Sequence, residues 1–437
     1  MAIVGSGLSG LRLAVDLAAA APRAEILLVE AGPLSRLEHE GRDRREHRGD
    51  GRVRLWGDTG TPLWGPSGGV KPRVGGRSLC WHGQLVPLED YALAGWPPVW
   101  QERLPRLCAG IVSELASLVE PPAPAPGPWS AAGLLPVPQA ARLEVDGEGV
   151  VRSWSAYSPL EAALDLANLT LIANSPITQV RRADGRWQLL RRDGPPLEVD
   201  LCVLSAGAVA NVAILAQSLQ VELRVPLCDH LCAGAVRGWT NPFPPPARPR
   251  GSATLLGYVR DEGLGANIFF QELAEAAGDV RLIDLWVLAE QSPGEASRLT
   301  CAPGADGAAR VSIEPRLSHE DRERLSAARR RGMQLVDSIL GSAAEISECA
   351  DEGVAIDAAL TAPQSWFGYE RPLGSVDHEA CSHSFGDLCD SDLAVPGLPG
   401  VYLNGPGVFP RAGAANPGLT ILALSSWLAG ALATRLT

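Results

Sequence analysis

Residues 2–30 read AIVGSGLSGLRLAVDLAAAAPRAEILLVE, and this stretch decides the fold. An apolar strand leads into Gly5, Gly7 and Gly10, and an alanine-rich helix and a second apolar strand ending at Glu30 follow. Such glycines let the backbone approach a pyrophosphate at the positive end of the helix, and the acid can accept hydrogen bonds from ribose hydroxyls. Because these features occur together, the stretch predicts a dinucleotide-binding βαβ unit. The motif alone leaves NAD and FAD open.

The length and charge of the chain limit what this unit belongs to. A chain of 437 residues is long for one hydrophobic core, so a cofactor domain and a substrate domain are expected. The formal net charge of −12 argues against nucleic acid as a partner, because a phosphate backbone attracts basic surfaces. The nine cysteines show no spacing typical of a metal site, so we expect no metal and a reduced, cytoplasmic setting.

The apolar stretches near the two ends of the sequence lead us to expect no association with a membrane. The chain starts on the first apolar strand without a basic and apolar leader, so secretion by its own signal is not expected. The run LTILALSSWLAGALA, from Leu419, is interrupted by two serines and is short for a bilayer. We therefore predict a buried helix there.

Four separated blocks resemble the glucose-methanol-choline (GMC) oxidoreductases, most closely the branch of pyranose oxidase and the gluconate dehydrogenase large subunit. The βαβ unit is the first block. The second, VGGRSLCWHGQLVPLEDY at residues 74–91, is similar to a segment of that branch that lies against the flavin. The third, from Asn168, resembles the family's returning strands and its alanine-glycine-alanine cofactor turn. SHSFG at residues 382–386 and the run from Asp392 resemble the C-terminal signature.

The resemblance implies FAD as the cofactor and an α/β fold, in which a substrate domain with an antiparallel sheet and helices interrupts a Rossmann-like FAD-binding domain. The expected FAD-binding domain comprises residues 1–90, 150–230 and 375–437, and the substrate domain comprises residues 91–149 and 231–374. The residues expected to bind FAD are Gly5, Gly7, Gly10, Glu30, Gly75, Gly76, Ser78, Cys80, Trp81, Ile177, Ala206, Gly207, Gly405 and Pro417.

The second block suggests how the flavin ring is held. Gly75 and Gly76 would let the backbone pass close to a flat ring, Ser78 would offer a polar group to it, and Trp81 would pack beside it. In the pyranose-oxidase-like pattern a histidine that carries a covalent flavin stands where this chain has Cys80. A buried cysteine usually packs as a small apolar group, so we expect a free thiol, with a thioether tether as the alternative.

Oxidation of an alcohol requires a group that takes the hydroxyl proton and a donor that stabilises the oxygen. In the family the base lies in a histidine-x-x-glycine segment followed by threonine, and its partner is a histidine or asparagine before the C-terminal helix. These positions fall on His383, which Gly386 follows, and on Asn416. His378, five residues before His383, is the competing candidate. Asp387 replaces the usual threonine, which is a departure from the pattern.

The resemblance implies an FAD-dependent oxidoreductase that oxidises a CH–OH group to a carbonyl, as a dehydrogenase or an oxidase. The expected partner is a small-molecule alcohol, such as a sugar, a cyclitol or another alcohol metabolite, and an electron-acceptor partner is left open. The alternative is a degenerate relative that serves as a partner subunit or catalyses a non-oxidative flavin-dependent step. Reduction of the flavin by sugars or polyols without oxygen distinguishes the two.

Overall fold

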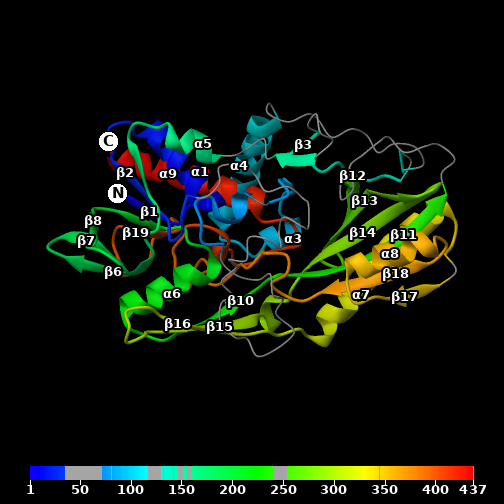
Figure 1. Ribbon diagram of the computed structural model, residues 1–437. Coiled ribbons are helices and arrows are strands. Elements are labelled where there is room, and N and C mark those ends of the chain that lie inside the picture. The colour runs from blue at the N-terminus through cyan, green and yellow to red at the C-terminus, as the bar shows by residue number, and fades with distance from the viewer. Residues whose placement is uncertain are drawn as a thin grey trace.

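The computed structural model shows two parts side by side (Figure 1). One part holds a parallel sheet covered by helices and both ends of the chain, and the other holds long antiparallel strands. The residues that the structure describes are 1–34, 71–79, 81–116, 129–130, 132–140, 142–145, 151–154, 159–240, 253–343 and 345–436.

The parallel sheet has five strands in the order β19-β9-β1-β2-β5. Its central strand β1 pairs with β2 on one side and with β9 on the other, and every pair in the sheet is parallel. The strands are β1 (Ala2–Val4), β2 (Ile26–Val29), β5 (Leu169–Ile172), β9 (Cys202–Leu204) and β19 (Val401–Leu403). The predicted Rossmann-like α/β arrangement, with strands returning from distant segments, is confirmed.

The C-terminal helix α9 (Gly418–Leu436) packs against α1 (Leu8–Ala20) and α4 (Pro98–Ala116). By length and composition α9 could cross a membrane. Its side chains Leu422, Leu424 and Leu428 are nevertheless buried completely against these neighbours. The predicted buried helix is confirmed, and its apolar surface is used in the contact with α1 and α4.

Helix α4 belongs to the segment expected in the substrate domain, but it lies with the nucleotide-binding part. Trp100 of α4 meets Trp427 of α9 edge to face, with ring centroids 4.8 Å apart. Arg12 of α1 pairs with Glu114 of α4 at 2.7 Å. The packing of this segment therefore does not follow the expected boundary at residue 91, and the domain boundaries stay predictions.

The second part is a six-stranded sheet in the order β12-β13-β14-β11-β18-β17, antiparallel except where β17 joins β18. The strands are β11 (His230–Thr240), β12 (Ala253–Asp261), β13 (Ala266–Ala277), β14 (Val280–Glu290), β17 (Ile346–Glu348) and β18 (Trp366–Arg371). The predicted antiparallel sheet is thus present. Its long strands reach back to the parallel sheet, and this places their ends beside the cofactor segments (Figure 1).

Two helices cover this sheet. Helix α7 (His319–Leu340) lies on the face that carries Leu285, and α8 (Glu352–Thr361) covers part of the opposite face, near Val236. The Ser318 side chain accepts a hydrogen bond from the N–H of Asp321 at 3.0 Å, which caps α7. The part of the second face that α8 leaves open forms one wall of a cavity.

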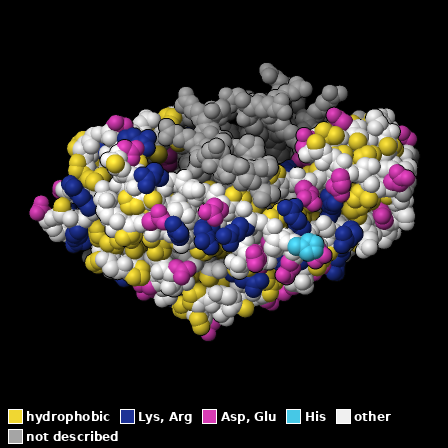
Figure 2. Space-filling view, turned by 90° about the horizontal axis from the view of Figure 1, so that it is seen from below, with side chains coloured by type: hydrophobic (Ala, Val, Ile, Leu, Met, Phe, Trp, Pro, Cys, Tyr) yellow, Lys and Arg dark blue, Asp and Glu magenta, His cyan; other side chains and the backbone are white. Residues whose placement is uncertain are grey.

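Smaller elements accompany these two parts. A three-stranded sheet of β6 (Ile177–Ala183), β7 (Arg186–Arg191) and β8 (Leu197–Val199) precedes β9, and another sheet holds β10 (Leu223–Leu227), β15 (Ser297–Ala302) and β16 (Arg310–Glu314). Among the described residues there are also the hairpin of β3 (Arg142–Val145) and β4 (Val151–Trp154) and the helices α3 (Asp90–Leu93), α5 (Pro159–Leu164) and α6 (Ala208–Leu219). Acidic and basic side chains intermingle on the face shown in Figure 2.

The turn between β1 and α1 generates the first prediction. A Cβ on Gly10 would lie 1.9 Å from the carbonyl oxygen of Gly5, whereas a Cβ on Gly110, which also lies in a helix, would meet nothing within 4 Å. We expect Gly10→Ala to lower the free energy of unfolding by about 1–3 kcal/mol, as overpacking does. Denaturant unfolding measures this change.

Gly110→Ala is the matched control, because it makes the same chemical change in an open part of a helix. It should raise the free energy of unfolding by up to about 1 kcal/mol, since alanine favours helices more than glycine does. Equal stabilities of the two variants would contradict the close packing of the turn.

Candidate active site

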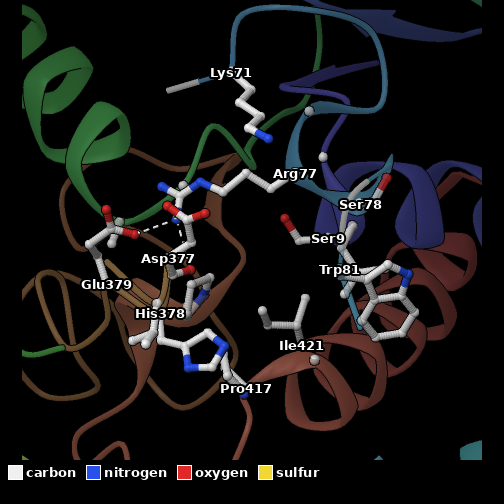
Figure 3. A pocket seen from close by; sticks show the side chains of 18 of the residues that line it. Ser9, Lys71, Arg77, Ser78, Trp81, Asp377, His378, Glu379, Pro417 and Ile421 are labelled. Atoms are coloured by element: carbon white, nitrogen blue, oxygen red, sulfur yellow. Dashed lines mark hydrogen bonds and ion pairs between the residues drawn. The ribbon is translucent and has the colours of Figure 1, made fainter. Parts of the chain in front are cut away.

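A cavity of about 1100 Å³ lies at the carboxyl ends of the parallel strands. The turns after β1, β2 and β9 line one side, and Trp286 and Leu288 of β14 line the other. Open parallel sheets bind their ligands at this edge. Figure 3 shows that side chains of the first helical turn, the loop before α9 and α9 itself converge there.

The glycine-rich turn forms the part of the cavity next to α1. Gly5 has φ of 100°, and a Cβ there would lie 2.5 Å from the carbonyl oxygen of Ser205. In contrast, a Cβ on Gly7 would meet nothing within 4 Å. Gly5 and Gly10 therefore pack the turn tightly, whereas Gly7 borders open space at the positive end of the helix. This arrangement fits a pyrophosphate.

Glu30 lies at the end of β2, as the βαβ pattern predicts. Its carboxylate accepts hydrogen bonds from the N–H of Ser6 at 3.0 Å, from the Ser6 hydroxyl at 2.7 Å and from the N–H of Gly32 at 3.0 Å. Burial raises the pKa of Glu30, and these hydrogen bonds oppose that shift. Glu30 lines the cavity and also holds the glycine-rich turn in place.

The structure brings most of the predicted cofactor residues to the cavity wall. Those that line it are Gly5, Gly7, Glu30, Gly76, Ser78, Trp81, Ile177, Ala206, Gly207 and Pro417. Gly10, Gly75 and Gly405 stand behind the wall, where Gly75 donates its N–H to the Ser6 hydroxyl at 3.1 Å and Gly405 packs against Ser9. Cys80 lies outside the described residues.

Sequence reasoning missed several polar groups in the cavity. Ser175 and Ser205 line it, and their buried side-chain oxygens have no hydrogen-bond partner among the described residues. Their distance from one another in the sequence left no motif by which they could be found.

Arg77 is another cavity residue that the sequence did not single out. Its Nη1 lies 2.5 Å from a carboxylate oxygen of Glu379 and donates to the carbonyl oxygen of Asp377 at 2.7 Å (Figure 3). The Glu379 side chain is almost fully buried, so its charge requires this partner. Arg77 thereby ties the second block of the sequence to the loop that carries His378.

His383, the expected base, does not line the cavity. Its side chain is 0% exposed, and a Cβ on Gly407 would lie 1.8 Å from its ring. Its ring nitrogens lie 2.9 Å from the Ser382 hydroxyl and 3.3 Å from the Asn211 amide. Burial lowers the pKa of His383 to about 3. The choice of His383 as the base is therefore corrected, because this ring is packed into the protein and cannot reach a ligand.

His378 faces the cavity, close to Pro417 (Figure 3), and His82 of the second block also lines it. Three residues later, Cys381 has φ of 64°, a left-handed conformation that favours glycine. The family's histidine-x-x-glycine frame thus fits His378 to Cys381, with cysteine in the place of glycine and Ser382 in the place of threonine. The sequence pattern pointed to His383 because a literal glycine, Gly386, follows it.

Asn416 and Pro417 directly precede α9 and line the cavity, where Figure 3 shows Pro417 close to His378. The turn before them is fixed by two buried carboxylates. Glu290 accepts hydrogen bonds from the Arg411 guanidinium and from the N–H of Gly413, the latter at 2.9 Å. The Glu89 carboxylate similarly accepts a hydrogen bond from the N–H of Ala414 at 3.1 Å. These anchors hold Asn416 at the end of the antiparallel sheet.

Residues 293–425, which include His378 and Asn416, match the family model of GMC oxidoreductases. The chain is related to the GMC oxidoreductases. A similar solved structure is pyridoxine 4-oxidase from Mesorbium loti, with 17% identity over 98% of this chain and 98% of that chain and a TM-score of 0.59. At this identity the likeness shows the fold. No curated protein matches the chain.

The relationship confirms FAD as the cofactor and an oxidoreductase as the class of protein, while the branch within the family stays a prediction. The cavity itself fits FAD: Gly7 leaves room at the positive end of α1, Glu30 ends the second strand, and Ser175 and Ser205 line the site. Trp81, whose ring touches Gly418 of α9, closes one side.

The open space at Gly7 generates a second prediction. We expect Gly7→Ala to weaken FAD binding at least about tenfold, which corresponds to about 1.4 kcal/mol, because the methyl group would enter the space for the pyrophosphate. The unfolding free energy without FAD should change by less than about 1 kcal/mol, since glycine and alanine differ modestly at a helix N-cap. FAD titration by fluorescence and unfolding of the apoprotein measure the two quantities.

Gly110→Ala again serves as the control and should bind FAD as the wild type does. A Gly7→Ala protein with unchanged FAD affinity would show that the dinucleotide does not pass this glycine.

Proposed function

We propose that the protein oxidises a CH–OH group of a small-molecule alcohol to a carbonyl, with His378 as the base and Asn416 as the partner that stabilises the oxygen. The observation that carries this proposal is the meeting of His378, Asn416 and Pro417 in the cavity at the carboxyl ends of the parallel strands. His378 thereby takes the role first given to His383, and Asn416 keeps its role.

The reaction divides into the removal of a hydride and the removal of a proton. Bound FAD supplies the acceptor for the hydride. His378 takes the hydroxyl proton at a ring nitrogen, and the amide N–H of Asn416 donates a hydrogen bond to the substrate oxygen as negative charge develops on it.

The wall opposite the cofactor residues indicates a ring-bearing alcohol. Trp286 lines the cavity and stacks on Phe269, with ring centroids 4.1 Å apart, so its plane is fixed. Leu288 and Gln271 lie near it on the same wall and offer an apolar surface and an amide. Sugars and cyclitols bind aromatic faces in this way, and the similar structure carries the name of an oxidase of pyridoxine, another ring-bearing alcohol.

Anaerobic reduction of the bound flavin tests this function. Sugars, cyclitols and pyridoxine are offered in turn to the oxidised protein, and bleaching of the flavin absorbance identifies an alcohol that is oxidised. Reoxidation of the bleached protein by oxygen or by a dye then separates an oxidase from a dehydrogenase. A protein that binds FAD but is reduced by no alcohol would favour a partner subunit or a non-oxidative flavin-dependent step.

The third prediction concerns the two histidines. We expect His378→Ala to retain FAD and to lose the rate of flavin reduction by about a hundredfold or more, as the loss of a general base does. His383→Gln is the control, because its side chain contacts Asn211 and Ser382 instead of the cavity. Stopped-flow reduction per bound FAD is the measurement. Normal rates in His378→Ala together with a selective loss in His383→Gln would return the role to His383.

The fourth prediction concerns pH. Burial lowers the pKa of His378 well below the ordinary value of 6.5, and the neighbouring His230 and Arg77 lower it further. A base must be neutral to accept a proton, so the reduction rate should stay constant as the pH falls through 6.5 and should decline only at lower pH. A pH profile of anaerobic flavin reduction measures this limb. A decline centred at 6.5 would contradict the assignment.

A further inference from the structure

A second histidine stands behind His378, away from the cavity. His230 begins β11 and is buried, and its Nδ1 lies 2.7 Å from Nδ1 of His378, with an angle of 90° between the rings. The Nε2 of His230 lies 2.9 Å from the carbonyl oxygen of Gly413. His378 lines the cavity, whereas His230 does not. The two rings thus form a chain from the backbone of the Gly413 turn to the cavity.

These contacts leave one arrangement of protons for two neutral rings. A carbonyl oxygen only accepts hydrogen bonds, so Nε2 of His230 carries a hydrogen and its Nδ1 has the lone pair. The contact between the two Nδ1 atoms then requires a hydrogen on Nδ1 of His378. Consequently, the lone pair of His378 is on Nε2.

Burial keeps both rings in the neutral state that this arrangement requires. It lowers the pKa of His230 to about 4 and that of His378 well below its ordinary value. The opposite arrangement, with a hydrogen on Nδ1 of His230, would require a doubly protonated ring because Nε2 of His230 must still donate to Gly413. A charged imidazolium in this buried position is disfavoured.

We propose that His230 is a positioning residue that accepts the Nδ1 hydrogen of His378 and so keeps the Nε2 lone pair of His378 free to take the hydroxyl proton. This inference rests on the proposed role of His378 as the base. When the proton moves to Nε2, the Nδ1 hydrogen stays in its bond to His230, so the ring receives its charge without turning. No proton passes on to His230.

The surroundings of His230 hold the accepting nitrogen in place. The N–H of Gly413 donates to Glu290, which stands opposite His230 in the pairing of β11 with β14. The carbonyl oxygen of the same glycine accepts a hydrogen bond from Nε2 of His230. The backbone N–H of His230 donates to the Asp229 carboxylate at 2.8 Å. Hydrogen bonds of its backbone and of its ring therefore both hold His230 in place.

The fifth prediction tests the tautomer directly. The oxidised holoprotein is labelled with ¹⁵N-histidine, and two-bond ¹H–¹⁵N correlation spectra near pH 8 distinguish protonated from bare ring nitrogens of the seven histidines. Signals are assigned by their loss in His378→Ala and His230→Leu. We expect His378 to carry its hydrogen on Nδ1. A hydrogen on Nε2 of His378 in the wild-type spectrum would overturn the proposal.

Two variants of His230 separate positioning from packing. His230→Leu removes the acceptor, so His378 should populate both tautomers and the rate of flavin reduction should fall at least about tenfold with little change in KM. His230→Asn places an oxygen near the position of Nδ1, so it should restore the Nδ1-protonated tautomer and most of the rate. His319→Gln, at a highly exposed histidine, is the control and should change neither.

An unchanged His378 tautomer in His230→Leu would also overturn the inference, as would equal rates in His230→Leu and His230→Asn when both hold FAD. Failure of the proposed function looks different. In that case no alcohol reduces the flavin, or His378→Ala is reduced normally, while the spectra still report the Nδ1-protonated tautomer.

Discussion

The ion pair of Glu290 with Arg411 is the interaction on which the candidate site depends. Glu290 ends β14 and its side chain is 1% exposed, so its charge is stable only with strong partners. The Arg411 guanidinium and the N–H of Gly413 supply them. The antiparallel sheet is thereby joined to the turn that precedes Asn416. This anchor helps to fix the relation of the two parts of the chain at the point where substrate and cofactor must meet.

A second buried ion pair acts in the same way on the other side of the cavity. Arg77, from the segment expected to lie against the flavin, binds Glu379, which directly follows His378. The two pairs connect residues that are 121 and 302 positions apart, and each has one almost fully buried carboxylate. Breaking such a pair leaves an uncompensated charge, which costs far more than the loss of a surface contact. The site is therefore rigid at the residues that would handle the proton.

Much of the nucleotide-binding part could be predicted from local pattern. The first βαβ unit, the buried C-terminal helix and the lining by Gly7 and Glu30 follow from residues that are close in the sequence. The proposed base, His378, could not be predicted in this way. The histidine-x-x-glycine frame of His378 ends at Cys381, which has a left-handed backbone. A glycine in the sequence indicates that such a conformation is allowed, whereas a cysteine gives no such indication. The literal pattern therefore selected His383, three residues before Gly386.

The sequence by itself determined the α/β class, the dinucleotide turn and the related family, because strand and helix periods and glycine spacing act over short distances. Only the tertiary structure decided that His378 lines the cavity while His383 does not, and which nitrogen of His378 carries the lone pair in our proposal. That decision depends on His230, 148 residues from His378, and on a carbonyl oxygen at Gly413. Contacts between such distant segments are set by the packing of two sheets, and no local pattern records them.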